Sequence, residues 1–212
     1  MGRWDAVSPF SCPGRRKPMR DGDQEGFEYE ATILTPRLLL RAGREADRPA
    51  IARLAGGAVN VAGLGTAAGG STAGGRAFVI VEREGGAIVG VCEYGPMAER
   101  PALVEVATWI AEPFCGRGLA TEGTQAVIDR AFADGGTMIL WCSVRVSDGR
   151  ARRVVEKCGF QYRGTGMGRS LTSFGAVPIE RFVLERKNWA SLKSWGARRQ
   201  TDGDDAPRDN AA

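Results

Sequence analysis

A glycine-rich stretch, EPFCGRGLATEG at residues 112–123, carries the clearest chemical signal in the sequence. It follows the strand-like run LVEVATWI and precedes the amphipathic run TQAVIDRAF, so we expect it to lead from a strand into a helix. Such a turn directs free backbone N–H groups and the positive end of the helix dipole towards one point. Gly116 and Gly118 would let the main chain approach an anion that a Cβ atom would keep away, so the stretch predicts a pyrophosphate site.

The neighbouring residues exclude two common phosphate-binding motifs. A Walker loop continues with Gly-Lys and then Ser or Thr, whereas this chain has Gly118-Leu119-Ala120. A dinucleotide-binding fingerprint would need a third glycine where Thr121 stands, an N-terminal βαβ unit and an acidic residue about 20 positions later. One alternative stays open, in which the glycines only form a tight turn from strand to helix.

Composition narrows the chemistry further. The chain contains no histidine, which excludes histidine-based triads, H-E-x-x-H zinc sites and a histidine general base. The five cysteines form no C-x-x-C pair, so neither a disulfide framework nor a metal site is supported. The formal net charge of +4 comes without a dense stripe of Lys and Arg, so we expect an anionic small-molecule ligand and no nucleic acid.

The elements that must position the turn follow from apolar periodicity. Strands are predicted over residues 33–41, 77–84, 87–94, 102–110, 137–146, 160–164 and 177–186. Helices are predicted over 44–56, from the turn to Gly135, and over 147–159 with Ser147 or Asp148 as N-cap. The glycine-rich residues 56–76 predict a loop. This mixed order predicts a single α/β sheet layered with helices.

Length and composition predict one folded domain at 31–190 between polar, disordered tails at 1–30 and 191–212. No apolar run approaches the ~18 residues of a membrane span, and the first thirty residues lack the apolar stretch of a signal peptide. We therefore expect a cytoplasmic protein that binds no membrane.

Three ordered motifs resemble the GNAT superfamily of acetyl-CoA-dependent N-acetyltransferases. CGRGLATEG is similar to its pyrophosphate loop, Gln/Arg-x-x-Gly-x-Gly/Ala. LTPRLLLR, VEVATWIAEPFCGRGLATEG and SDGRARRVVEKCGF resemble, in order, segments of its ribosomal-protein N-terminal acetyltransferase branch. The resemblance covers residues 33–187 and implies a mostly antiparallel sheet of about six to seven strands. It also implies that strands 102–110 and 137–146 splay apart, with acetyl-CoA as cosubstrate in the gap between them.

The resemblance assigns cofactor contacts residue by residue. The pantetheine would pair with the backbone near Trp109 and Ile110. Asp148 would either hydrogen-bond the pantetheine or only cap a helix, and Arg152, with Arg150, Arg153 and Lys157, would either meet the 3′-phosphate or form a solvated basic face. The pyrophosphate would rest on the turn formed by Cys115, Gly116, Arg117, Gly118, Ala120 and Thr121.

The sequence departs from the branch at four positions. Cys115 replaces a Gln, Arg or aromatic residue, Asp148 an Asn, Ala151 a Ser, and Val155 the tyrosine of many other members. No general acid can therefore be named. Cys115 at a helix N-terminus would also suit a covalent acyl-cysteine mechanism, which lacks a base in the nearby sequence.

Glu105 is the candidate general base, because the branch often carries a glutamate in this strand; the alternative is a solvated or paired carboxylate. Without histidine the site suits an α-amine, which costs about 1 kcal/mol to neutralise at pH 7, against about 4.6 kcal/mol for a lysine. We expect an N-acetyltransferase, monomeric or homodimeric, that acts on an amine, with protein N-termini leading. The alternative is a catalytically weak acyl-CoA-binding sensor or interaction module.

Overall fold

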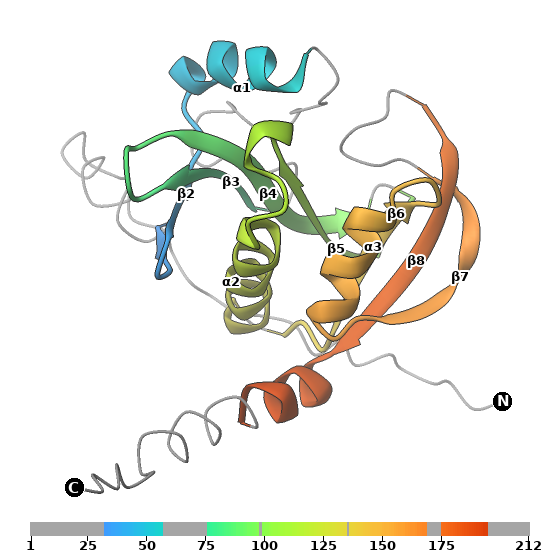
Figure 1. Cartoon of the computed structure of the whole chain (residues 1–212). Coiled ribbons are helices and arrows are strands. Elements are labelled where there is room, and N and C mark those ends of the chain that lie inside the picture. Colours follow the sequence, from blue (N-terminus) through green and yellow to red (C-terminus); the bar gives the residue numbers. More distant parts are fainter. Residues whose placement is uncertain (1–31, 57–75, 98, 135, 169–174, 195–212) are drawn as a thin grey trace, which may run out of the picture. The chain divides into compact units, whose positions relative to one another are not determined.

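The computed structural model describes residues 32–56, 76–97, 99–134, 136–168 and 175–194, and all of these lie within one compact unit, Ala31–Ala212. The expected N-terminal tail, most of the glycine-rich loop and residues 195–212 lie outside the described residues. The described residues form an eight-stranded sheet in the order β1-β2-β3-β4-β5-β6-β8-β7 (Figure 1). Its strands are β1 Ile33–Leu34, β2 Leu38–Ala42, β3 Arg76–Glu82, β4 Ile88–Met97, β5 Arg100–Ile110, β6 Ile139–Arg145, β7 Gln161–Gly168 and β8 Val177–Glu185.

The sheet is mixed and mostly antiparallel, which confirms the predicted fold class. Among the described strands, β5 and β6 form the parallel pair, and every other neighbouring pair is antiparallel. Gly85 and Gly86, both with positive φ, form the turn that joins β3 to β4 in an antiparallel hairpin.

The first predicted strand, over 33–41, is wrong in one respect, because the structure divides it into β1 and β2. These two strands pair antiparallel, with Ile33 opposite Leu40. The chain reverses at Pro36, which has no N–H to donate to a sheet and favours a turn. Thr35 N donates to Leu38 O at 2.9 Å across this turn. The described sheet therefore has eight strands instead of six to seven.

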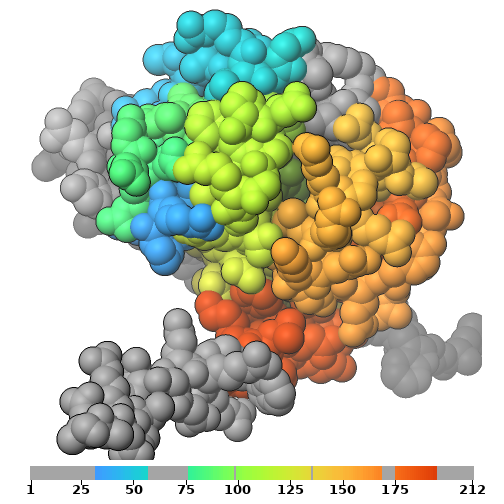
Figure 2. All heavy atoms as spheres, in the orientation of Figure 1, coloured from blue at the N-terminus to red at the C-terminus, as the bar shows by residue number. Residues whose placement is uncertain are grey.

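Helices cover both faces of the sheet. The helix α1, Arg48–Ala55, lies on one face, where Ile51 packs with Val79, Val81 and Val91. The helices α2, Leu119–Ala133, and α3, Gly149–Lys157, lie on the other face, and Figure 2 shows their surfaces, yellow-green and orange, side by side. A further helix over 186–194 crosses the boundary expected at 190.

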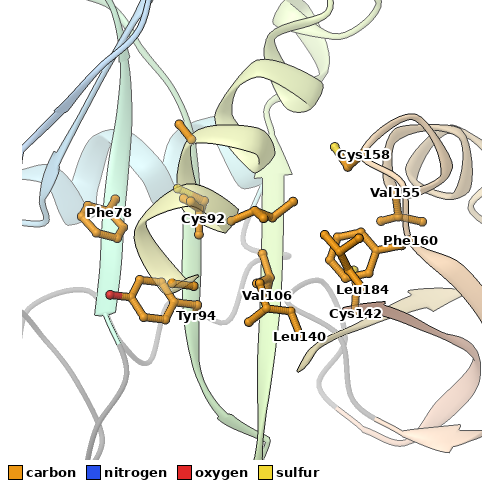
Figure 3. Packing of buried hydrophobic residues seen from close by; sticks show 14 of the residues in the cluster. Phe78, Cys92, Tyr94, Val106, Leu140, Cys142, Val155, Cys158, Phe160 and Leu184 are labelled. Atoms are coloured by element: carbon orange, nitrogen blue, oxygen red, sulfur yellow. The ribbon is translucent and has the colours of Figure 1, made fainter. Parts of the chain in front are cut away.

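The larger core lies beneath α2 and α3. Every second residue of the central strands points into it, including Phe78, Cys92, Val106 and Leu140 (Figure 3). Five residues of the amphipathic run in α2 recur at helical spacing and are all buried, namely Thr124, Val127, Ile128, Ala131 and Phe132. This packing fixes α2 on the sheet and so holds its N-terminus at the end of β5.

Candidate functional site

The strands β5 and β6 pair at two positions and then part. Val104 is the register partner of Leu140, and Glu105 that of Trp141. Beyond these pairs, residues 106–110 of β5 and 142–145 of β6 line opposite walls of a cleft of about 1030 Å³. The predicted divergence of the two strands is therefore confirmed, and the cleft has the size of a small-molecule site.

The glycine-rich turn forms one end of this cleft. Trp109, Ile110, Cys115, Gly116 and Gly118 all line it, as do Ala120 and Thr121 of the first turn of α2. Gly116 has φ +80° and Gly118 has φ +79°, a left-handed conformation that side chains with a Cβ rarely adopt. The structure thus brings together most of the residues expected to bind the cofactor.

Backbone donors at the start of α2 are left for a ligand. Gly118 occupies the N-cap position, where it offers no side-chain cap. The first backbone bond of the helix runs from Glu122 N to Gly118 O at 3.1 Å. The N–H groups of Leu119, Ala120 and Thr121 therefore have no carbonyl partner within the helix, and with the helix dipole they form an anion-binding geometry.

Arg117 differs from its neighbours in the turn because its side chain does not line the cleft. Its guanidinium pairs with Glu82 of β3. Its carbonyl oxygen accepts a hydrogen bond of 2.8 Å from Arg37 Nη1. The guanidinium of Arg117 is therefore engaged by Glu82, and a ligand in the cleft would meet the main chain of Arg117 instead of its side chain.

Cys115 is exposed and lines the cleft, as expected. Its Sγ lies 3.6 Å from the carbonyl oxygen of Ile110 and 3.6 Å from that of Ala111. In this geometry the thiol donates to the main chain that joins β5 to the turn, so the proton is used to hold the turn.

The opposite lip of the cleft is the N-terminal half of α3. Asp148 lines the cleft and is also the N-cap, since its Oδ1 accepts from Ala151 N at 3.0 Å. The capping role predicted for Asp148 is thus present, and this bond satisfies one of the free N–H groups of α3. Ala151 also lines the cleft, without a hydroxyl group to offer a leaving thiolate.

The basic residues of α3 divide into two groups. Arg150, Arg153 and Lys157 line the cleft. Arg152 does not, because its side chain turns towards Glu156 and Glu180, at 2.9 and 2.8 Å. A helix of this length presents different residues to its two sides, and the sequence pattern alone did not fix which arginine faces the ligand.

Glu105 lies where β5 and β6 part, on the sheet face opposite α2 and α3. Burial raises the pKa of its carboxyl group, although hydrogen bonding from Ser143 and the charge of Arg181 act against this effect. Its Oε1 is buried and has no hydrogen-bond partner among the described residues. A carboxylate with a raised pKa and a free oxygen is suited to accept a proton.

Two further residues on this face were missed by sequence reasoning. Glu93 of β4 pairs with Ala107 and lies diagonal to Glu105, and burial followed by the charge of Glu105 raises its pKa. Trp141 is the register partner of Glu105, and its Nε1 is a buried donor without a partner in the described part of the chain. Strand register was the missing signal, because it brings these residues together from three separate segments.

Neither a metal site nor a membrane span is found in the described ranges. They contain no group of three or more His, Cys, Asp or Glu side chains placed to hold a metal ion. No helix among them is both long and apolar enough to cross a bilayer.

Solved structures share this arrangement at low sequence identity. RimJ from Mycobacterium smegmatis, solved with a CoA disulfide, matches with a TM-score of 0.58 and 20% identity over 75% of this chain and 89% of that chain. RimL, a ribosomal L7/L12 alpha-N-protein acetyltransferase solved with coenzyme A, has a TM-score of 0.55 and 14% identity over 72% and 96%. The spermidine/spermine N-acetyltransferase SpeG from Vibrio cholerae has a TM-score of 0.59 and 17% identity over 75% and 99%. At these identities the likeness establishes the fold.

The family assignment comes from the sequence. No curated protein matches the chain. A family model described as an acetyltransferase (GNAT) domain matches residues 37–161, more than half of the chain. With the parted strands and the glycine turn in place, the chain belongs to the GNAT family of N-acetyltransferases, and its cosubstrate is acetyl-CoA.

Proposed function

We propose that this acetyltransferase acts on a primary amine, with the N-terminal α-amine of a protein or peptide as the leading acceptor, by direct attack in a ternary complex. The proposal is supported by two features, one that lines the cleft and one that lies next to a lining residue. Free amide donors at the start of α2 lie at one end of the cleft. Glu105, with its raised pKa and free oxygen, does not itself line the cleft but directly precedes the lining residue Val106, where the strands part.

The proposed roles of the cleft residues follow from their chemistry. The free N–H groups of Ala120 and Thr121, with the main chain of Gly116, Arg117 and Gly118, would hold the diphosphate. The edge of β5 at Trp109 and Ile110 is free of β6, so its backbone groups are available to the pantetheine arm. Arg150, Arg153 and Lys157 supply positive charge at the opposite lip.

In the reaction the amine nitrogen attacks the thioester carbonyl carbon, the new C–N bond forms and the C–S bond breaks. Glu105 accepts the proton that the amine loses, either directly or through a water molecule. Backbone N–H groups at the sheet opening stabilise the developing oxyanion. Ala151 and Val155 offer no proton to the departing sulfur, but a thiol with a pKa of ~8.5 leaves tolerably as the thiolate near neutral pH.

The choice of an α-amine rests on proton energetics. The fold itself does not select the acceptor, since RimL is named for protein α-amines and SpeG for polyamines. An α-amine is neutralised at pH 7 for about 1 kcal/mol, whereas an alkyl amine such as lysine costs about 4.6 kcal/mol. A site whose base is a single carboxylate is better matched to the smaller cost.

A peptide panel tests this proposal. The purified chain is incubated with acetyl-CoA and peptides in matched forms, with a free N-terminus, with a blocked N-terminus and an internal lysine, and with spermidine as a third amine. Mass spectrometry should find acetylation of free N-termini first. Preferred acetylation of lysine or spermidine would overturn the acceptor assignment. Acetyl-CoA binding by calorimetry without amine-dependent turnover would favour the acyl-CoA-binding module.

A further inference from the structure

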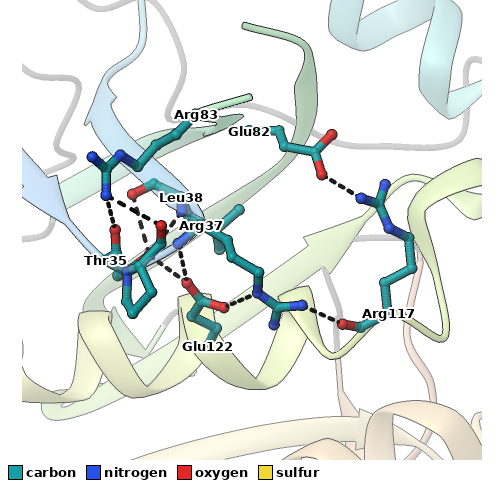
Figure 4. A network of polar contacts seen from close by, with 8 residues as sticks. Thr35, Arg37, Leu38, Glu82, Arg83, Arg117 and Glu122 are labelled. Atoms are coloured by element: carbon teal, nitrogen blue, oxygen red, sulfur yellow. Dashed lines mark hydrogen bonds and ion pairs between the residues drawn. The ribbon is translucent and has the colours of Figure 1, made fainter. Parts of the chain in front are cut away.

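A polar cluster made of Thr35, Arg37, Glu122 and the Arg117 carbonyl joins the β1–β2 turn to the start of α2 (Figure 4). Glu122 Oε1 accepts from the Thr35 hydroxyl at 2.6 Å and from Arg37 N at 2.9 Å. Its Oε2 accepts from Arg37 Nε at 2.7 Å. Arg37 Nη1 then donates to Arg117 O at 2.8 Å, inside the glycine turn. One arginine thus links a carboxylate of α2 to the backbone of the turn.

The bond to Arg117 O fixes the direction of the next amide. A trans peptide is planar, so the carbonyl of Arg117 and the N–H of Gly118 point in opposite directions. With Arg37 holding the carbonyl, the Gly118 N–H points away from Arg37, and Gly118 is one of the residues that line the cleft. The fit is close, because a Cβ atom on Gly118 would lie 3.4 Å from Arg37 Nη2.

Arg37 also compensates a charge. Glu122 lies in the first turn of α2, next to the amides that face the cleft. An unpaired carboxylate there would repel a diphosphate at the helix N-terminus. Burial alone would raise the pKa of Glu122, but hydrogen bonds from Thr35 and Arg37 and the charge of Arg37 lower it overall, so the carboxylate stays ionised and paired.

We propose that Arg37 and Glu122 are positioning residues for the diphosphate of acetyl-CoA: Arg37 orients the peptide between Arg117 and Gly118 through the Arg117 carbonyl and neutralises Glu122, without touching the ligand itself. The inference rests on the proposed placement of the diphosphate at the glycine turn. It assigns a role in cosubstrate binding to a segment that lies 85 residues before Glu122 in the chain.

The test compares two ligands and matched variants of the full-length chain. The ligands are acetyl-CoA and S-acetylpantetheine, which lacks the diphosphate and the nucleotide. Arg37→Met should raise the Kd for acetyl-CoA about tenfold, equivalent to about 1.4 kcal/mol, and leave the Kd for S-acetylpantetheine unchanged. Arg83→Met is the matched control, because the Arg83 side chain donates to Thr35 O and Pro36 O in the β1–β2 turn and not to the glycine turn. It should leave both dissociation constants unchanged.

Variants at Glu122 distinguish charge compensation by Arg37 from the simple loss of its hydrogen bond to the Arg117 carbonyl. Glu122→Gln keeps an oxygen acceptor for Arg37 and should change the Kd for acetyl-CoA less than Arg37→Met does. The double variant Arg37→Met/Glu122→Gln removes the unpaired carboxylate and should bind acetyl-CoA more tightly than Arg37→Met alone. Thermal unfolding of each variant establishes that it is folded; if Arg37→Met is not, Arg37→Lys, which keeps the charge without the fork, takes its place.

Each contrary outcome has a separate meaning. If the unaltered chain binds S-acetylpantetheine as tightly as acetyl-CoA, the diphosphate placement itself fails. Suppose instead that the unaltered chain prefers acetyl-CoA. The positioning role is then overturned, while the diphosphate site stands, if Arg37→Met keeps its affinity for acetyl-CoA or loses affinity equally for both ligands. The same conclusion follows if Arg37→Met loses no more affinity than Arg83→Met. A double variant no better than Arg37→Met overturns the charge compensation.

Discussion

Glu105 and Trp141 are register partners at the last paired position of β5 and β6, and each holds a buried polar atom that has no partner among the described residues. The carboxylate Oε1 can accept a hydrogen bond, and the indole Nε1–H can donate one. A donor and an acceptor left free side by side are suited to a bound group that can do both, such as a water molecule or an amine. The position where the sheet opens therefore carries both the proposed base and a group that can orient its partner.

Trp141 should tolerate loss of its N–H better than Trp189 does. Trp189 Nε1 donates to Asp129 Oδ1 at 2.7 Å, whereas Trp141 Nε1 has no partner within the described ranges. Trp→Phe removes the same atoms at both positions, so the difference isolates the hydrogen bond. Trp189→Phe should lower the free energy of unfolding by about 1–3 kcal/mol more than Trp141→Phe, because a bond to a charged group is lost. Chemical denaturation measures both.

The same pair tests the role of Trp141 in catalysis. Trp141→Phe should lower kcat and leave the Kd for acetyl-CoA unchanged, because its free N–H belongs to the register partner of the proposed base Glu105 and Trp141 does not line the cleft. Trp189→Phe should leave both quantities unchanged at a temperature where it is folded. Equal kcat values for Trp141→Phe and the unaltered chain would limit Trp141 to packing.

Glu105→Gln should lower activity and raise stability at neutral pH. The folded-state pKa of Glu105 is raised above its ordinary value of 4.5. The folded chain therefore binds this proton more tightly than the unfolded chain, and its contribution to stability is complete below pH 4.5 and declines as pH rises through the raised pKa. Once the pH exceeds that raised pKa, the buried carboxylate is ionised at a net cost that glutamine removes.

Activity should follow the opposite trend with pH. The base works when ionised, so the rate should fall as pH drops through the raised pKa of Glu105. Glu105→Gln should lower kcat by about 10²-fold and leave a rate that depends on the neutral fraction of the amine alone. Unchanged turnover in Glu105→Gln, measured across pH, would remove Glu105 from the role of base.

Gly116 and Gly118 should respond differently to alanine. Both have φ near +80°, so either substitution should cost about 1–2 kcal/mol of stability from backbone strain. A methyl group on Gly116 meets no atom within 4 Å, whereas one on Gly118 lies 3.4 Å from Arg37 Nη2. Gly118→Ala should therefore weaken acetyl-CoA binding more than Gly116→Ala does, although the two variants should lose a similar free energy of unfolding. Calorimetry and thermal unfolding together decide this, and equal binding losses would contradict it.

The basic residues of α3 should differ in how much they contribute to binding the 3′-phosphate of CoA. Arg153 lines the cleft and Arg152 is held by Glu156 and Glu180. Arg153→Gln should weaken binding of CoA more than binding of dephospho-CoA, which lacks that phosphate. Arg152→Gln should weaken neither. A selective loss of CoA affinity in Arg152→Gln would show that Arg152 binds the 3′-phosphate. Equal affinities in all variants would show that these basic side chains are solvated and do not contact the phosphate.

Local patterns in the sequence predicted the parts of the site that depend on consecutive residues. The order of strand, glycines and helix predicted the turn at Gly116 and Gly118, and the position of Asp148 before a helical run predicted a cap. Both features are set by the backbone within a few residues. The divergence of β5 and β6 was inferred from resemblance, since no local pattern determines which strands pair.

The features that were not predicted depend on contacts between distant segments. Pro36 divides the first strand, and the turn so formed brings Arg37 to Glu122. The direction of Arg152 depends on how α3 rotates against β8, where Glu180 lies. Glu93 and Trp141 join Glu105 only through strand register. Side-chain type alone gave no sign of these neighbours.

The narrow junction between β5 and β6 has a mechanical consequence. Within the sheet, the described strands β1–β5 are connected to β6–β8 through two register pairs. An elongated cosubstrate would bridge the junction between β5 and β6, because it would bond to the exposed edge of β5 and also contact α3. It would take the place of an additional strand between them. Binding of acetyl-CoA should therefore slow amide hydrogen exchange in β1–β5 and in β6–β8 together. The enzyme would reach its full rigidity only when the cosubstrate that it consumes is bound.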